Sequence, residues 1–140
     1  MRASRSALLS ALKRQLAPGE LRLDDLSRAR HAGDKWFASH APEAVAFPRS
    51  QRAISTILRF ANGHGIPVTA RGAGYGYVGG CVPVRGGIAL SLMRMNRIRE
   101  INPQDFVAIV QPGVVTAALQ DAVERQGLYY SPDSASRAFG

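Results

Sequence analysis

The chain has 140 residues, the size of a single domain or of part of one. Hydrophobic residues make up 46% of it and charged residues 20%, which excludes an intrinsically disordered chain, and its longest uncharged stretch, 106–120, is too short and too interrupted for a membrane-spanning helix. The formal net charge of +8 is typical of a protein with a polyanionic partner, but no run of five like charges occurs, so we expect no nucleic-acid surface and no transmembrane segment.

The first predicted element is an amphipathic helix over 4–16, in which Leu9, Leu12 and Leu16 recur at helical spacing. The first 19 positions contain four basic residues and no acidic residue, a pattern shared by surface helices and by organellar targeting peptides. We expect the surface helix and a cytoplasmic location, with a mitochondrial location as the alternative. The irregular pattern of 21–37 predicts a partly helical segment.

The middle of the chain carries the clearest helix signal. A short strand is expected at 45–47, and Ser50 is a good N-cap for a helix that stops at Gly63 and Gly65. The apolar stripe of this helix consists of Ile54, Ile57, Leu58 and Ala61.

Alternating apolar residues and Pro or Gly stops define the remaining elements. In chain order they are strands at 66–70, 88–92 and 106–110 and a helix at 115–126. Gly127 is the expected C-cap of that helix, the arginine-rich segment 94–99 is interpreted as an exposed connector, and the tyrosine pair at 129–130 as a buried strand. This order of elements predicts an α+β fold, a small sheet with flanking helices, preceded by the N-terminal helix.

A glycine-rich segment follows the strand at 66–70. Nine of the chain's 14 glycines lie between positions 63 and 87, a density that predicts a loop because glycine weakens helix and strand interiors. The loop contains a GxGxxG pattern at Gly74, Gly76 and Gly79. However, Pro83 and the glycine pair at 86–87 prevent the helix that a dinucleotide fingerprint of the Rossmann type needs.

Backbone N–H groups of a glycine-rich loop can converge on an anion without a helix, and Arg71 at the start of this loop adds positive charge. The sequence therefore predicts a phosphate-binding loop, with a wide glycine turn that binds nothing as the alternative.

The sequence contains few signals for disulfide, metal or catalytic chemistry. The single cysteine, Cys81, and three histidines without the HExxH spacing predict no disulfide, no metal site and no catalytic residue, and His64 is interpreted as a helix-end residue.

Six motifs occur in order, at 45–50 (VAFPRS), 66–80 (IPVTARGAGYGYVGG), 86–92, 101–103 (INP), 110–113 (VQPG) and 128–133 (LYYSPD). Together they resemble the N-terminal half of the FAD-binding PCMH-type domain, the fold of the vanillyl-alcohol oxidase and p-cresol methylhydroxylase superfamily. Within it they are most similar to the glycolate oxidase FAD-linked subunit and D-lactate dehydrogenase group. The resemblance covers 42–140, a truncated first subdomain, and leaves 1–41 as an N-terminal helical extension.

The resemblance implies that the glycine-rich loop wraps the diphosphate of FAD. The residues at this contact would be Arg71, Gly72, Ala73, Gly74, Tyr75 and Gly76. Gly79 and Gly80 would allow the close turn, and Pro132 and Asp133 would approach the cofactor from the other side. Tyr75 stands where other members carry a histidine bonded to the flavin, so FAD is expected to be non-covalent.

The same resemblance implies an FAD-linked oxidoreductase. Its substrate would be a small 2-hydroxy acid of the glycolate or D-lactate type, oxidised by hydride transfer to FAD, and its partner an electron-acceptor subunit. The family's second glycine-rich stretch and cap domain would follow Gly140, so the isolated chain is not expected to be active alone. Two alternatives stay open: a non-catalytic module that binds a nucleotide or nucleic acid, and the remnant of a degraded oxidase gene.

Overall fold

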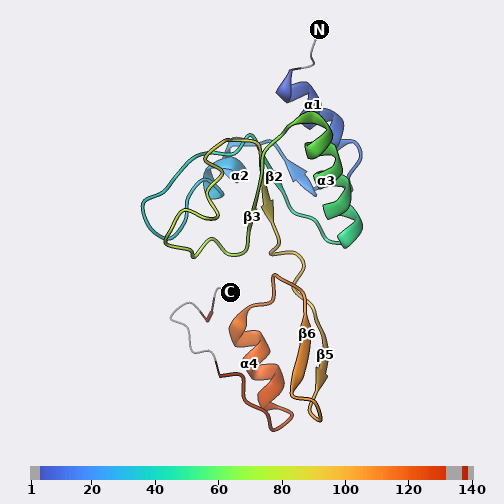
Figure 1. Cartoon of the computed structure of the whole chain (residues 1–140), viewed down its shortest axis with the longest axis vertical. Coiled ribbons are helices and arrows are strands. Elements are labelled where there is room, and N and C mark those ends of the chain that lie inside the picture. Colours follow the sequence, from blue (N-terminus) through green and yellow to red (C-terminus); the bar gives the residue numbers. More distant parts are fainter. Residues whose placement is uncertain (1–3, 132–136, 139–140) are drawn as a thin grey trace.

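The structure, a computed structural model, describes residues 4–131 and 137–138. Its larger part is a four-stranded mixed sheet with three helices (Figure 1). The strands, in their order across the sheet, are β1 (Leu21–Arg22), β2 (Ala44–Ala46), β4 (Ile88–Ser91) and β3 (Val68–Arg71). The strands β2 and β3 both run parallel to β4, whereas β1 is antiparallel to β2.

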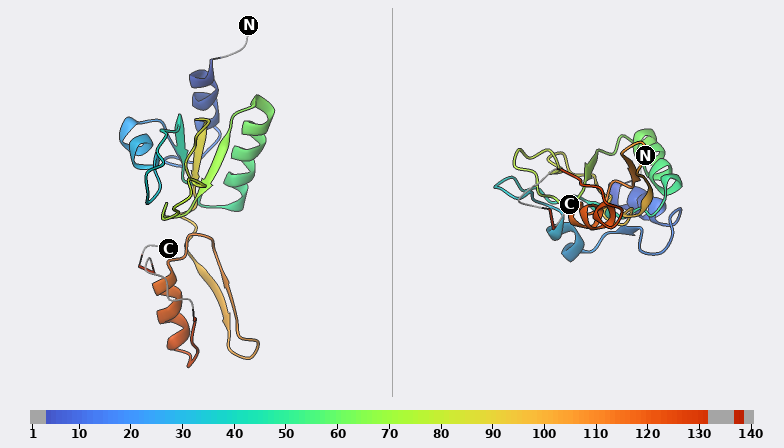
Figure 2. Two further views of the ribbon diagram at one scale, coloured as in Figure 1. Left: turned by 60° about the vertical axis from the view of Figure 1, so that its left-hand side comes forward. Right: turned by 90° about the horizontal axis from the view of Figure 1, so that it is seen from below.

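The three helices of this part are α1 (Arg5–Lys13), α2 (Asp25–Arg30) and α3 (Gln51–His64). Figure 2 shows α2 and α3 on opposite sides of the sheet. The Ser50 side chain caps α3 by accepting the Ala53 N–H at 3.2 Å, and Gly65 ends the helix in the left-handed conformation, with φ at +62°. The sequence therefore predicted both ends of α3.

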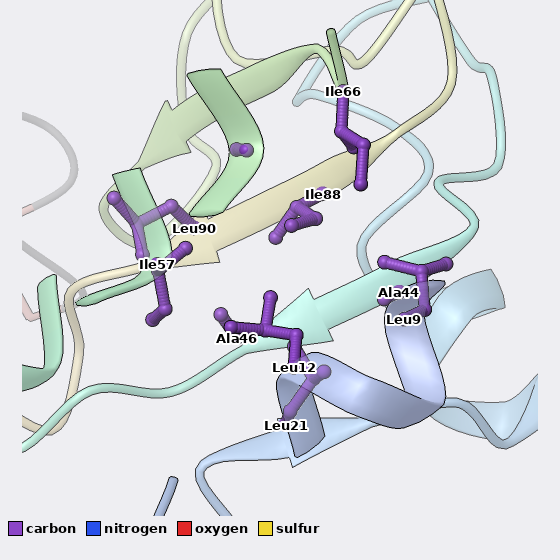
Figure 3. Close-up of a cluster of buried hydrophobic side chains, with 10 residues drawn as sticks. Leu9, Leu12, Leu21, Ala44, Ala46, Ile57, Ile66, Ile88 and Leu90 are labelled. Atoms are coloured by element: carbon purple, nitrogen blue, oxygen red, sulfur yellow. The ribbon is translucent and has the colours of Figure 1, made fainter. Parts of the chain in front are cut away.

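One hydrophobic core joins α1, α3 and one face of the sheet (Figure 3). Leu9 and Leu12 of α1 pack with Ile57 of α3 against alternate sheet residues, among them Ile88 and Leu90. Leu12 and Ile57 are completely buried. The N-terminal helix is thus an integral part of the core.

The second part consists of an antiparallel hairpin and one helix, drawn below the four-stranded sheet in Figure 1. Its elements are β5 (Ile98–Asn102), β6 (Val107–Val110) and α4 (Thr116–Glu124). It joins the first part closely at Gly113, whose N–H donates to the Met95 carbonyl at 2.8 Å. A Cβ at Gly113 would overlap the Leu92 carbonyl oxygen, so glycine permits this approach.

The α+β fold class, with a small sheet and flanking helices, is confirmed, and several details are corrected. The sequence analysis did not predict β1, which has only two residues. It also did not predict the exposed hairpin strand β5, because its arginines were interpreted as part of a connector. The stripe of α3 includes buried Ala53, whereas Leu58 is 44% exposed. The C-cap of α4 is Arg125, and Gly127 follows it with φ at +73°.

The buried strand expected at 129–130 was also wrong. Tyr129 and Tyr130 belong to no strand and are 74% and 39% exposed. Aromatic pairs are typical of strands only where a neighbouring strand covers them, and no described segment does so. Within residues 4–131 and 137–138, every helix falls short of the length and apolar character that a bilayer crossing requires.

The core placement of α1 predicts that Leu12→Ala lowers the free energy of unfolding by about 2–5 kcal/mol, because it removes a fully buried side chain from a packed interior. Leu58→Ala is the matched control and should lower it by less than about 1 kcal/mol. Urea unfolding followed by circular dichroism measures both. Equal losses would contradict the assignment of α1 to the core.

Candidate functional site

The glycine-rich loop leaves the carboxyl end of β3 and runs over 72–80 without helix or strand, as the sequence predicted. The backbone N–H groups of Gly72, Ala73, Gly74 and Gly76 donate no hydrogen bond within the part of the chain that the structure describes. Polar backbone groups rarely stay unpaired unless water or a ligand reaches them. The loop therefore presents a row of donors at the end of a sheet strand.

Arg71 lies beneath this loop rather than beside it. Its side chain is buried, and its Nη1 donates to the carbonyl oxygens of His31 at 2.9 Å and Gly33 at 3.1 Å. Gly74 has φ at +83°, and a Cβ there would overlap Arg71 Nη2. The guanidinium thus supports the loop from below, and Gly74 makes room for it.

A second segment, 33–39, folds against the same loop. The Asp34 carboxylate accepts the Gly79 N–H at 2.9 Å, and the Lys35 N–H donates to the Gly76 carbonyl at 3.1 Å. The ammonium of Lys35 lies 4.9 Å from the centre of the Tyr75 ring. Sequence analysis missed this contact because Asp34 and Gly79 are 45 positions apart and neither belongs to a recognisable pairing pattern.

Two cavities flank the loop, and Ala73 lines both. One, of about 510 Å³, lies between the loop and segment 33–39, and Arg30 and Lys35 are among the residues that line it. The other, of about 210 Å³, lies between Gly72 and the 112–115 turn and includes Asn96. The loop backbone is therefore accessible from two sides.

The other residues from the sequence analysis lie apart from this loop or at its end. Nothing lies within 4 Å of a Cβ added to Gly80, and Cys81 beside it is half-buried. His64 is the last residue of α3 and packs against Phe60, with ring centres 4.4 Å apart and ring planes tilted by 47°. Among the described residues there is no group of three potential metal ligands. Pro132 and Asp133 lie outside the described residues.

Arg94 was assigned to an exposed connector, and this was wrong. Its Nη1 donates to the Gly19 carbonyl at 3.0 Å, and its guanidinium lies 5.0 Å from the centre of the Phe47 ring. Such pairing with a ring and a carbonyl is typical of arginine at a partly buried position. Arg94 therefore links the β4 end of the sheet to the turn before β1.

Comparisons with known proteins identify the protein family to which the chain belongs. Residues 42–140 match the family model described as FAD binding domain, and the chain belongs to this family. It is 39% identical over 133 residues to D-2-hydroxyglutarate dehydrogenase of Stutzerimonas stutzeri, covering 93% of this chain and 28% of that protein. It is 43% identical over 95 residues to glycolate oxidase subunit GlcD of Bacillus subtilis, covering 68% of this chain and 20% of that protein. The chain thus spans well under a third of these relatives.

Solved structures show the same fold. Alkyldihydroxyacetonephosphate synthase superposes with a TM-score of 0.86 over 99% of this chain and 28% of its own, at 22% identity. For p-cresol methylhydroxylase the TM-score is 0.81 over 96% of this chain and 28% of its own, at 21% identity. The resemblance to the PCMH-type FAD-binding domain is therefore confirmed, and FAD is the cofactor of this domain.

The loop geometry fits the diphosphate of FAD. Phosphate oxygens only accept hydrogen bonds, and the loop offers backbone donors without partners in the described chain. A Cβ added to Gly72 or Gly76 would meet no atom within 4 Å, so open space lies against the backbone at both positions. Arg30 and Lys35, which line the adjoining cavity, add favourable charge.

His31, whose carbonyl accepts from Arg71, is half-buried at the end of α2. Burial lowers its pKa below the ordinary value of 6.5, and the charges of Arg71 and Arg30 lower it further, against the effect of its hydrogen bond to the Ser27 carbonyl. The unfolded chain therefore takes up a proton at this residue at a higher pH than the folded chain does.

This direction predicts that the free energy of unfolding falls as the pH is lowered from about 7 to below 6.5, because protonation of His31 favours the unfolded state. In His31→Gln the decrease over the same interval should be smaller. Urea unfolding at several pH values measures it. An identical pH dependence in both proteins would contradict the assignment.

Proposed function

We propose that the chain supplies the diphosphate-binding part of an FAD-linked oxidoreductase that oxidises a small 2-hydroxy acid. The names of the relatives support this substrate class, since D-2-hydroxyglutarate and glycolate are both 2-hydroxy acids. When bound, FAD would supply the redox chemistry by accepting a hydride from the carbon that carries the hydroxyl group. The role of this chain is to bind and orient the cofactor.

The observation that carries the proposal is the set of backbone donors at Gly72, Ala73, Gly74 and Gly76. Backbone donors that are held by contacts outside the loop bind a diphosphate with less rearrangement than flexible side chains need. Gly72, Ala73, Gly74 and Gly76 would donate N–H groups, with the Tyr75 backbone between them. The tyrosine at position 75 forms no flavin bond of the histidine type, so FAD would be held non-covalently.

The remaining site residues have supporting roles in this proposal. Arg71 would act through the loop it supports, and Gly79 and Gly80 would permit the return of the chain after the diphosphate. Pro132 and Asp133 would reach the cofactor from the far side. Residues 42–140 would form the first half of the FAD domain, and residues 1–41 an extension that packs on it.

We also infer a cytoplasmic location rather than import into mitochondria. Removal of an N-terminal targeting peptide would take Leu9 and Leu12 away from the core of this chain. A small 2-hydroxy acid and an electron-acceptor subunit are the further partners in this proposal, and the chain spans 28% of the length of D-2-hydroxyglutarate dehydrogenase.

FAD titration of the chain tests the proposal, with Gly72→Ala and Gly76→Ala as variants. Both sites have room for a methyl group in the free protein, so the fold should survive. We expect FAD affinity to fall at least about tenfold, because the methyl group separates the backbone from the phosphate oxygens.

Gly63→Ala is the matched control, since Gly63 lies in α3 and also has open space around it. It should bind FAD as the wild type does. Flavin fluorescence measures binding, and ADP should compete because it carries the same diphosphate. No saturable binding of FAD by the folded wild-type chain, or equal affinity in all three variants, would contradict the proposal.

A further inference from the structure

Asp34 is an unexpected residue at a loop that binds a diphosphate. Asp34 lines the same cavity as Ala73 and Gly74. A negative charge at this place repels phosphate oxygens. The presence of Asp34 is therefore not explained by attraction to the ligand.

The hydrogen bonds of Asp34 point to a geometric role. One carboxylate oxygen, Oδ2, accepts the Gly79 N–H at 2.9 Å, and the other, Oδ1, accepts the Trp36 N–H at 2.8 Å. The second bond fixes the turn of segment 33–39, while the first attaches that turn to the end of the glycine-rich loop. Hydrogen bonds to a charged acceptor are about twice as strong as neutral ones.

The two ends of the loop are thus held from the same segment. Arg71 binds the carbonyls of His31 and Gly33 at the start of the loop, and Asp34 binds Gly79 near its end. The Lys35 N–H binds the Gly76 carbonyl between them. A chain so rich in glycine has many alternative conformations, and each contact removes some of them before the ligand arrives.

We propose that Asp34 is a positioning residue for FAD binding, which fixes the end of the glycine-rich loop so that the donors at 72–76 face the diphosphate. The inference rests on the proposed function. Replacing Asp34 would change the FAD affinity in two opposite ways. Loss of the Asp34 charge alone would strengthen FAD binding, whereas loss of its hydrogen bonds would weaken it.

The experiment compares FAD affinity in the wild-type chain, Asp34→Ala, Asp34→Asn and Asp121→Ala. We expect Asp34→Ala to bind FAD at least about tenfold more weakly. Asp34→Asn should lie between it and the wild type, because the amide oxygen can replace only one of the two acceptors. Asp121 is exposed on α4, so Asp121→Ala makes the same change in net charge without touching the loop. Equal or tighter binding by Asp34→Ala than by Asp121→Ala would overturn the proposal.

A second readout needs no FAD. In Asp34→Ala the Gly79 N–H should exchange with solvent deuterium at least about tenfold faster, while the Ile57 N–H in α3 keeps its rate. The fluorescence anisotropy of Trp36, the chain's single tryptophan, should fall because its backbone N–H no longer donates to the Asp34 carboxylate. Faster exchange throughout the chain would indicate unfolding and would overturn a local role. An unchanged Gly79 rate would overturn it as well.

The two readouts distinguish the possible failures. If the wild-type chain binds no FAD, the proposed function fails, and hydrogen exchange still decides whether Asp34 fixes the loop. If the wild type binds FAD and Asp34→Ala binds it equally well, the proposed function stands and the role of Asp34 is wrong.

Discussion

The buried guanidinium of Arg71 connects the parts of the molecule on which the site depends. It stands at the end of β3, reaches the carbonyls of His31 and Gly33 after α2, and lies directly under Gly74. An arginine removed from water needs hydrogen-bond acceptors, and these two carbonyls supply them. The segment after α2 and the glycine-rich loop therefore have to stay together, and the N-terminal residues become part of the site's architecture.

This arrangement differs in principle from an anion site at a helix N-terminus. No helix follows the glycine-rich loop, so no helix dipole or regular turn orients its N–H groups. Orientation comes instead from contacts outside the loop, made by Arg71, Asp34 and Lys35. Such external support restricts the conformations of a flexible sequence, and it lowers the entropy lost when a diphosphate binds.

The sequence predicted those features whose signal lies within a few neighbouring residues. The glycine density marked the loop, and Ser50 with Gly65 marked both ends of α3. It could not predict the contact of segment 33–39 with the loop, because those partners are 38 to 45 positions apart. The hairpin strand β5 was not predicted because its arginines are typical of an exposed connector. The tyrosine pair at 129–130 was assigned to a buried strand because a local pattern does not show whether a neighbouring strand exists.

Binding of the FAD diphosphate by the loop backbone is measured by the amide NMR spectrum of the chain during titration with FAD and, separately, with riboflavin. FAD should shift the N–H signals of Gly72, Gly74 and Gly76, whereas riboflavin, which lacks phosphate, should leave them in place. The Gly63 signal in α3 should not move with either ligand. Unmoved loop signals at saturating FAD, or equal shifts with riboflavin, would show that the loop backbone does not bind the diphosphate.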